Sequence, residues 1–226
     1  MINHLKKTVF LYVLIGFLNA YAGVYEDFFR AIHRDDVATV AQLIQRGADP
    51  NWPNESGMPA LHLAIQLENK ATPVYLAKLP QTKPTTLNRH GETALMMAAI
   101  QNRLDVARAL VERGAEVNQP GWTALHYAAT RGHREMIRFL LDQSAYIDAE
   151  APNGNTPLMM AAQFAPPLTS KLLLEEGADP NLRNNLGRSA LDLALLRENQ
   201  QAAFYIRAFL EAWEVNERAQ SEGVAH

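Results

Sequence analysis

The sequence predicts an all-α solenoid of about six helix–turn–helix units with short hairpin-like fingers between them. A glycine-led phrase recurs as GMPALHLA, GETALMMA, GWTALHYA, GNTPLMMA and GRSALDLA, with its glycines 34, 30, 33 and 33 residues apart. A second phrase keeps step with it as LIQRGADPN, LVERGAEVN, LLDQSAYID and LLEEGADPN. Between the phrases, apolar residues recur at helical spacing, as in Met136, Ile137, Leu140 and Leu141.

Each unit carries residues that begin and end short helices. Threonine or serine follows the repeat glycine by two residues in four units, where its hydroxyl can cap the first helix. The second helix ends at a glycine, which adopts the left-handed conformation at little cost. The predicted caps are Thr93, Thr123, Thr156 and Ser189, and the predicted ends are Gly47, Gly114, Gly177 and, at a cost of about 1 kcal/mol, Ser144.

The repeats and the segments that flank them predict the domain boundaries. Residues 1–22 are predicted to be a signal peptide, 23–218 the repeat domain and 219–226 a disordered tail. The units span approximately 24–52, 53–88, 89–118, 119–151, 152–184 and 185–216, and the last has a longer closing helix. One helix pair cannot bury its own apolar face, so stability requires neighbouring units to stack.

Three units depart from the common pattern. The second has two prolines in place of a Gly-Ala-Asp end, so residues 79–86 are predicted to form an irregular, mobile loop. The finger that ends at Gly121 is three residues shorter than most of the others, which predicts a clipped hairpin that sets back the rim beside Trp122. In the fifth unit FAPPL replaces the usual turn, so its second helix is expected to begin near Leu168.

The N-terminal segment has the composition of an export signal. Lys6 and Lys7 precede the apolar run TVFLYVLIGFL, and Ala20 and Ala22 fit a small-residue cleavage site. An uncleaved anchor helix is the alternative, but a bilayer span needs about 20 apolar residues and Asn19 ends the run early. We therefore expect cleavage after Ala22 and a periplasmic protein with no stable membrane anchor, with secretion as the second choice.

Charge and cysteine content narrow the class of protein further. Loss of the two N-terminal lysines leaves 19 basic and 24 acidic residues, a net charge of −5, so no basic patch for nucleic acid is expected. The chain contains no cysteine, which excludes disulfides and a lipid-modified cysteine anchor.

The phrases GWTALHYAATRGH and LLEEGADPN resemble the ankyrin repeat, and the resemblance covers approximately residues 24–215. It implies that Thr123 and His126 hydrogen-bond within and between turns, and that Gly132 and His133 form the inter-helix turn. His62 has the same role in the second unit. Methionine or aspartate occupies the histidine position elsewhere, at Met96, Met159 and Asp192, so we interpret these histidines as structural rather than catalytic.

The resemblance also implies where a partner binds. In ankyrin repeat proteins partner contacts tend to come from the finger tips and from the exposed ends of the first helices, which are expected to form one concave stripe. The matching positions are Trp52, Glu55, Gln66, Arg89, His90, Glu92, Gln101, Gln119, Trp122, Arg131, Asn153, Asn155, Gln163, Phe164, Asn185 and Arg188.

Two aromatic residues in this set are the most informative. Exposed aromatic side chains often supply much of the binding energy at an interface, which favours Trp122 and Phe164 as contacts. For Trp122 a scaffold role, covering a neighbouring loop, is an equally weighted alternative. Tyr127 and Met160 are expected to be partly buried wall residues.

The sequence contains no recognisable catalytic or phosphate-binding motif, and neither a metal nor a cofactor is expected. The leading hypothesis is a non-enzymatic protein-binding module of the periplasm, monomeric alone, that protects, inhibits or assembles an exported enzyme, toxin or envelope complex. The alternatives are a small-molecule or hydrolytic site in the groove, and a self-associating spacer that uses Phe204, Phe209 and Trp213.

Overall fold

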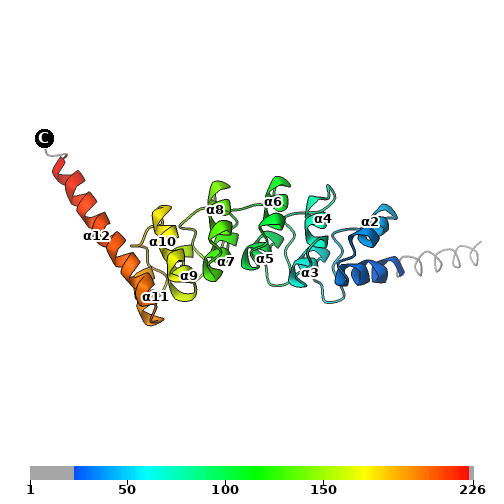
Figure 1. Ribbon diagram of the computed structural model, residues 1–226, viewed down its shortest axis with the longest axis horizontal. Coiled ribbons are helices and arrows are strands. Elements are labelled where there is room, and N and C mark those ends of the chain that lie inside the picture. The colour runs from blue at the N-terminus through cyan, green and yellow to red at the C-terminus, as the bar shows by residue number, and fades with distance from the viewer. Residues whose placement is uncertain (1–22, 224–226) are drawn as a thin grey trace, which may run out of the picture. The chain divides into compact units, whose positions relative to one another are not determined.

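Helix follows helix along the chain, and tight turns join consecutive helices in pairs (Figure 1). The computed structural model describes residues 23–223, so the predicted signal peptide lies outside the described residues. Within these residues the β pairings are two isolated bridges, Pro53 with Pro59 and Leu87 with Thr93. The predicted all-α architecture of helical hairpins with short fingers is confirmed.

The chain divides into two units, Met1–Ala94 and Leu95–His226. Unit 1 contains a helix over residues 23–33, α2 (Val37–Gln45), α3 (Ala60–Gln66) and α4 (Thr72–Lys78). Unit 2 begins within α5 (Ala94–Ile100) and continues with α6 (Leu104–Glu112), α7 (Ala124–Arg131), α8 (Arg134–Asp142), α9 (Pro157–Phe164), α10 (Pro167–Glu175), α11 (Ala190–Leu196) and α12 (Gln200–Gly223). Each of the six predicted repeat ranges holds one pair of helices.

The predicted caps begin the first helices of unit 2. Thr123 Oγ1 accepts a hydrogen bond from the His126 N–H at 3.5 Å, and His126 Nδ1 accepts one from the Thr123 N–H at 3.2 Å. Thr156 caps α9 through the Met159 N–H, and Ser189 caps α11 through a box closed by Asp192. These hydroxyls satisfy N–H groups that would otherwise lack a partner in the first helical turn.

The ends of the second helices are also as predicted. The backbone at Gly114 and Gly177 has φ angles of 83° and 99°, and Gly47 has a φ of 102°. Ser144 takes the same left-handed region with a φ of 63°, although it has a side chain. Each of these residues turns the chain from a second helix into the next finger.

Buried histidines tie one repeat to the next. His126 Nε2 lies 3.0 Å from the carbonyl oxygen of Asn155, and His62 Nε2 lies 3.1 Å from that of Glu92. A carbonyl oxygen accepts only, so Nε2 carries the proton in both rings. The implied roles of Thr123 and His126 within and between turns are confirmed. For His62 only the bond to the next repeat is confirmed, because its Nδ1 has no hydrogen-bond partner among the described residues.

A second tie between repeats lies at the inter-helix turns. Gly132 caps α7 with a φ of 74°, and His133 then donates from Nε2 to the Ile100 carbonyl at 3.0 Å. Asn199 occupies the place of His133 in the last repeat and donates to the Ala162 carbonyl at 3.2 Å. Such hydrogen bonds contribute about 0.5–1.5 kcal/mol each, and they fix the register of neighbouring hairpins.

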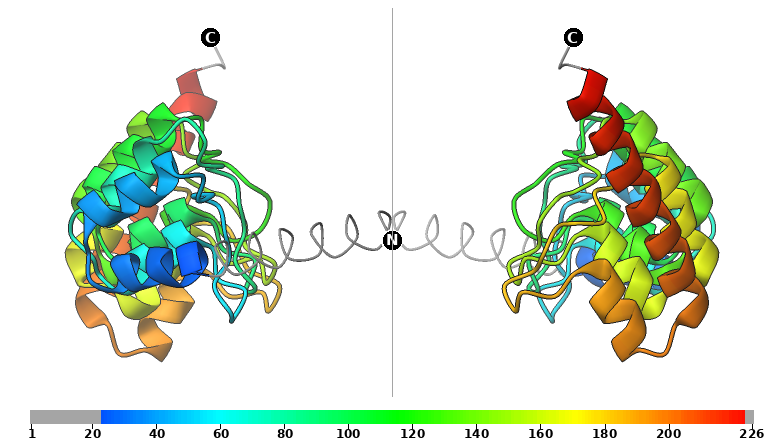
Figure 2. Two further views of the ribbon diagram at one scale, coloured as in Figure 1. Left: turned by 90° about the vertical axis from the view of Figure 1, so that its right-hand side faces the viewer. Right: turned by 90° about the vertical axis from the view of Figure 1, so that its left-hand side faces the viewer.

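Small and branched apolar side chains form the core of unit 2. Helix α9 packs between α7 and α11, and α12 packs against α10 and α11. Leu125 and Leu158 are buried, and so are Ala128 and Ala161, which let the helices approach closely. Within unit 2 the helices lie on one side and the finger loops project from the other (Figure 2).

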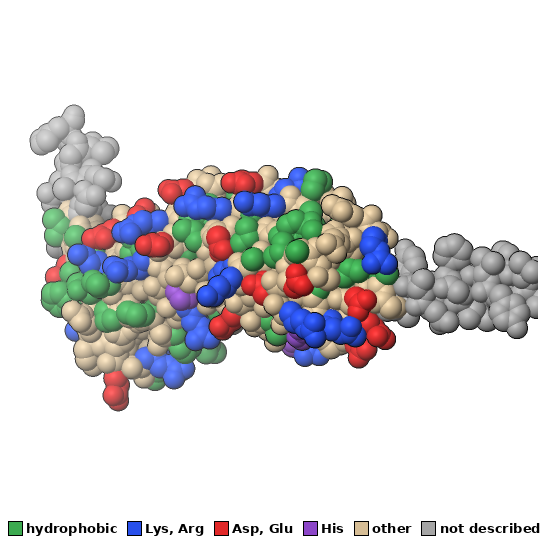
Figure 3. All heavy atoms as spheres, turned by 45° about the vertical axis from the view of Figure 1, so that its right-hand side comes forward, with side chains coloured by type: hydrophobic (Ala, Val, Ile, Leu, Met, Phe, Trp, Pro, Cys, Tyr) green, Lys and Arg blue, Asp and Glu red, His purple; other side chains and the backbone are tan. Residues whose placement is uncertain are grey.

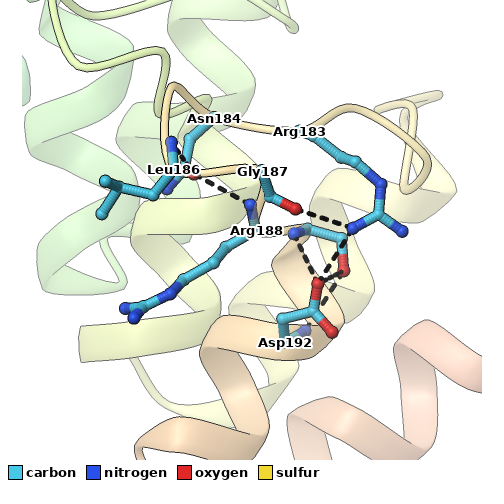
Figure 4. A network of polar contacts seen from close by, with 7 residues as sticks. Arg183, Asn184, Leu186, Gly187, Arg188 and Asp192 are labelled. Atoms are coloured by element: carbon cyan, nitrogen blue, oxygen red, sulfur yellow. Dashed lines mark hydrogen bonds and ion pairs between the residues drawn. The ribbon is translucent and has the colours of Figure 1, made fainter.

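An asparagine braces the base of three fingers. Asn184 Oδ1 accepts hydrogen bonds from the backbone N–H groups of Leu186 and Arg188, both at 3.0 Å (Figure 4). Asn54 and Asn88 brace their fingers in the same way. Local hydrogen bonds therefore hold the turn of each of these fingers.

The departures from the repeat pattern lie where they were predicted. Residues 79–86 have no regular structure, and Asn51 holds this loop by donating to the Gln81 carbonyl and accepting from the Lys83 N–H, both at 2.8 Å. The loop's mobility stays a prediction. Helix α10 begins at Pro167, within one residue of the expected start.

The closing helix is longer than the other helices of unit 2, as expected. Helix α12 has 24 residues and reaches Gly223, so the tail predicted from residue 219 is helical at its start rather than disordered. None of the helices among the described residues is long and apolar enough to cross a membrane.

We predict that the buried histidines make stability depend on pH. Burial lowers the pKa of both His62 and His126 below the ordinary value of 6.5. The unfolded chain therefore binds protons more readily than the folded chain, and the free energy of unfolding falls as the pH drops below about 6.5. A His62→Met/His126→Met variant, with the residue that two other repeats use, is expected to show a weaker dependence.

Urea unfolding at about pH 7.5 and pH 5 measures this difference. The exposed His33→Gln variant is the control and should keep the dependence of the parent chain. An unchanged pH dependence in the double methionine variant would show that these rings do not carry the effect.

We predict that Gly154 is more sensitive to substitution than Gly187. Both have positive φ angles, 76° and 69°, so alanine costs about 1–2 kcal/mol at either place. At Gly154 an added Cβ would also lie 2.5 Å from Asn185 Oδ1 and 2.8 Å from the Asn185 backbone nitrogen, whereas nothing lies within 4 Å at Gly187. Gly154→Ala should therefore lower the free energy of unfolding by about 1–2 kcal/mol more than Gly187→Ala. Equal losses in urea unfolding would contradict the close approach of the two fingers.

Candidate functional site

The finger tips of unit 1 present polar side chains. Glu55, Arg89 and His90 are exposed, and Arg89 Nε donates to His90 Nε2 at 3.1 Å. Glu92 is half-buried and accepts a hydrogen bond from Asn88 Nδ2 at 2.8 Å. These residues offer hydrogen-bonding and charged groups but no large apolar surface.

Trp52 belongs to the scaffold of the first repeat. Its ring centroid lies 5.6 Å from that of Tyr25 and 5.8 Å from that of Phe28. Phe28 is fully buried. Trp52 is half-buried, so its larger role is to close the apolar layer of the first hairpin.

Trp122 has the scaffold role, and part of its ring stays accessible, so its role as a partner contact stays a prediction. The ring is half-buried and packs edge-on against His126, at 5.4 Å between centroids, and tilted against Tyr127 at 6.3 Å. Part of the ring supports the capped start of α7 and the rest is accessible. The short finger that ends at Gly121 contains bends and no β-bridge. Gln119 in this finger donates from Nε2 to Met96 Sδ at 3.7 Å.

Asn155 does not belong to the exposed surface. Its side chain is 8% exposed, and its Oδ1 accepts a hydrogen bond from Asn184 Nδ2 at 2.8 Å. The expectation that it faces a partner is corrected, because it links the bases of two fingers. Asn153 and Asn185 stay exposed at the tips, where the Asn185 N–H donates to the Asn153 carbonyl at 3.1 Å.

The first helices of unit 2 share one outward face. Helical spacing places residues three and four apart together, and equivalent positions align because α9 packs between α7 and α11. We call this face the inner-helix surface, and its residues are Tyr127, Arg131, Met160, Gln163, Phe164, Leu196 and Arg197. Met160 is 8% exposed and Tyr127 half-buried, so both are wall residues as expected.

Phe164 is the centre of the inner-helix surface. Its side chain is 49% exposed, and the guanidinium carbon of Arg197 lies 5.1 Å from its ring centroid. Arg131, Phe164 and Arg197 occupy the same position of three successive repeats. Leu196, beside Arg197, is 60% exposed.

The sixth repeat contributes residues that the sequence reasoning missed. Leu196 and Arg197 correspond to Gln163 and Phe164, so extending the same repeat position by one unit would have found them. Leu186, which is 75% exposed at a finger tip, was also missed, because the sequence reasoning named only its polar neighbours Asn185 and Arg188 in that finger. Arg188 is exposed beside it, as predicted (Figure 4).

The remaining predicted helix-end residues have different surroundings. Gln66 in unit 1 is exposed. Gln101 is half-buried, and its Oε1 atom is buried without a hydrogen-bond partner. Gln163 is half-buried and donates from Nε2 to the Met159 carbonyl of its own helix at 3.2 Å. Neither half-buried glutamine is as accessible as Phe164.

The titratable groups of this region serve the fold. The two histidines with lowered pKa values bond to backbone carbonyls inside the stack. Burial raises the pKa of Asp148, which accepts the Asp179 N–H at 3.1 Å. A polar cleft of about 200 Å³ lies in unit 1, lined in part by Asp27, Arg34 and Arg46, and none of the predicted site residues lines it.

The exposed side chains offer charged and apolar groups through which another molecule could be bound. In the face seen in Figure 3, basic and acidic side chains are interspersed and apolar side chains lie between them. Within residues 23–223 no group of three or more His, Asp or Glu side chains is placed to hold a metal ion. The arrangement offers stacking, apolar contact and charged hydrogen bonds at one place.

Comparison with known proteins identifies the repeat. The family model described as "Ankyrin repeats (3 copies)" matches residues 28–120 and 117–184. Among curated proteins the chain is 32% identical over 167 residues to the putative palmitoyltransferase ZDHHC13 of Danio rerio, and 36% identical over 120 residues to human Neurogenic locus notch homolog protein 1. These matches cover 73% and 51% of this chain but 21% and 5% of those proteins, so it spans a small part of each.

Two solved structures are similar over most of their length. One is a chain from the Bd0816 predatory endopeptidase of Bdellovibrio bacteriovorus in complex with immunity protein Bd3460, with 28% identity, a TM-score of 0.70, and coverage of 80% of this chain and 97% of that one. The other is an ankyrin repeat domain from Acinetobacter baumannii, with 24% identity, a TM-score of 0.69, and coverage of 80% and 96%. The second likeness concerns the fold alone.

The family model covers well over half of the 226 residues, and its repeats are the helical hairpins described above. Ankyrin repeats mediate binding between proteins. On this ground the chain belongs to the ankyrin repeat family.

Proposed function

We propose that this chain is an exported, non-enzymatic protein that binds a protein partner against its inner-helix surface. The observation that carries the proposal is the exposure of Phe164 and Leu196, 49% and 60%, at positions where neighbouring repeats have Arg131 and Gln163. The stack does not need apolar groups at both positions, since the fourth repeat has Thr130 and Arg131 there. Apolar groups left at such positions favour a contact with another molecule.

Within that class, we propose that the partner is an exported peptidase and that binding inhibits it. The solved complex of a predatory endopeptidase with an immunity protein supports this narrower role, because the similar chain is matched over 97% of its length. The apolar N-terminal run after Lys6 and Lys7 supports export. Export brings the chain to the compartment where such an enzyme acts.

A binding role also agrees with the placement of the polar groups. His62 and His126 are both 1% exposed or less and bond to the backbone of the following repeat. A catalytic residue has to reach a substrate, and neither ring does. The inner-helix surface instead presents groups that act without proton transfer.

We predict that the full chain is exported and processed when it is produced in a Gram-negative host. The expected product is periplasmic and begins at Gly23, because the apolar run has the length of a signal rather than of a membrane span. Cell fractionation and intact mass measure this outcome. Full-length chain in the inner membrane would favour the anchor alternative.

We predict that Phe164→Ala weakens capture of the partner from an envelope extract by about tenfold and leaves the stability of the chain within about 1 kcal/mol of the parent. Phe204→Ala is the matched control, because Phe204 is 65% exposed on α12, away from the inner-helix surface. Phe164 is a cleaner probe than Trp122, whose ring also supports His126.

The peptidase activity of the captured partner tests whether this chain inhibits an exported peptidase. Its peptide hydrolysis is expected to fall on addition of the parent chain and to recover with Phe164→Ala. Capture of a protein without peptidase activity would refute inhibition of a peptidase, and equal effects of the two phenylalanine variants would refute the surface itself.

A further inference from the structure

The inner-helix surface carries arginines that have no acidic partner within residues 23–215. The ion pairs of the described side chains are Asp27–Arg30, Arg103–Asp105, Lys171–Glu175 and Arg183–Asp192. Arg131 and Arg197 belong to none of them, and neither does Arg188 at the neighbouring finger. Figure 4 shows the contrast, since Arg183 points to Asp192 while Arg188 points away from it.

The paired arginine shows how the fold satisfies such a group when it is structural. Arg183 Nη1 lies 2.8 Å from the Gly187 carbonyl and 3.2 Å from Asp192 Oδ2, so it braces the last finger against α11. Among the described residues, neither Arg131 nor Arg197 forms an ion pair that joins a finger to a helix, as Arg183 does. The chain as a whole is acidic, with a net charge of −3, whereas the inner-helix surface carries two arginines and no acidic residue.

The stacking of Arg197 leaves part of its guanidinium group available. The guanidinium carbon lies 5.1 Å from the Phe164 ring centroid, an arrangement that holds the side chain through a cation–π contact. The N–H groups at the edge of a guanidinium stacked on a ring stay free to donate to a carboxylate in bidentate fashion. Glu198, the next residue in the turn, forms no ion pair with it.

Repeat geometry sets the distance between the two arginines. Arg131 and Arg197 are at equivalent positions of α7 and α11, with α9 between them. Packed helices lie about 8–10 Å apart, so the two positions are separated by roughly 16–20 Å. An extended segment rises about 3.3 Å per residue and its side chains alternate between two faces, so residues about six apart would reach both arginines from one face.

We propose that the inner-helix surface recognises an acidic, apolar segment of the partner protein. Carboxylates about six residues apart, on one face of the segment, bind Arg131 and Arg197, and a large apolar side chain on the same face between them contacts Phe164 and Leu196. This inference rests on the proposed function and names the chemistry of the segment that occupies its site. The two arginines also attract an acidic segment toward the surface during association.

Three labelled peptides of about 14 residues test the proposal, with fluorescence polarisation on the full processed chain. In the first, two glutamates stand six residues apart, with phenylalanine two and leucine four residues after the first glutamate, so that all four side chains lie on one face of an extended chain. The second has lysine for both glutamates, and the third has serine for both apolar residues. The first is expected to bind about tenfold more tightly than either of the others, and more weakly as NaCl rises from about 50 to 300 mM.

Variants of the chain connect that preference to the named residues. Arg131→Gln/Arg197→Gln is expected to weaken binding of the acidic, apolar peptide by about tenfold, whereas Arg138→Gln, an exposed arginine on α8, should leave it unchanged. Arg197→Lys keeps the charge but not the planar fork, and should bind with intermediate affinity. Circular dichroism confirms that each variant is folded.

The outcomes separate this inference from the proposed function. If the lysine peptide binds as tightly as the acidic one and both bind less to Phe164→Ala, the surface stands and the acidic partner is refuted. If no peptide binds more tightly to the parent than to Phe164→Ala, while Phe164→Ala still loses the captured partner, the acidic segment is refuted and the surface is retained. If capture is also unchanged in Phe164→Ala, both proposals fail.

Discussion

The structure depends on burial between hairpins rather than within them. A pair of helices of seven to nine residues cannot enclose its own apolar face, so Leu125 and Leu158 are buried only because the next hairpin covers them. Alanines at 128 and 161 keep the first helices close enough for this contact, since a larger side chain would separate them. The contacts between repeats and the alignment of their surface residues follow from this stacking.

Stacking buries backbone carbonyl groups as well as apolar side chains, and the buried carbonyls need hydrogen-bond donors. Two fingers bring a backbone carbonyl beside the preceding hairpin, where a buried side chain donates to it. His62 does so for Glu92, and His126 does so for Asn155. This demand explains why polar residues that look functional in the sequence are buried in the structure.

The same stacking brings chemically distinct residues into register on the surface. Positions not needed for burial are free to vary, and the ends of α7, α9 and α11 carry Arg131, Phe164 and Arg197 at one repeat position. Because the backbones beneath them are held by buried contacts, these side chains have a fixed spacing. A surface of this kind recognises a partner through the order of its side chains rather than through a pocket.

The sequence by itself determined the repeat, the helix pairs, their caps and the irregular loop at 79–86, because period, capping residues and prolines act within a few positions of the chain. Tertiary structure alone decided which exposed-looking residues are accessible. Asn155 is buried by a contact with Asn184, 29 residues away, and Trp52 is held by Tyr25 and Phe28. The stacking of Arg197 on Phe164 likewise joins two repeats across 33 positions, and no local pattern encodes such a contact.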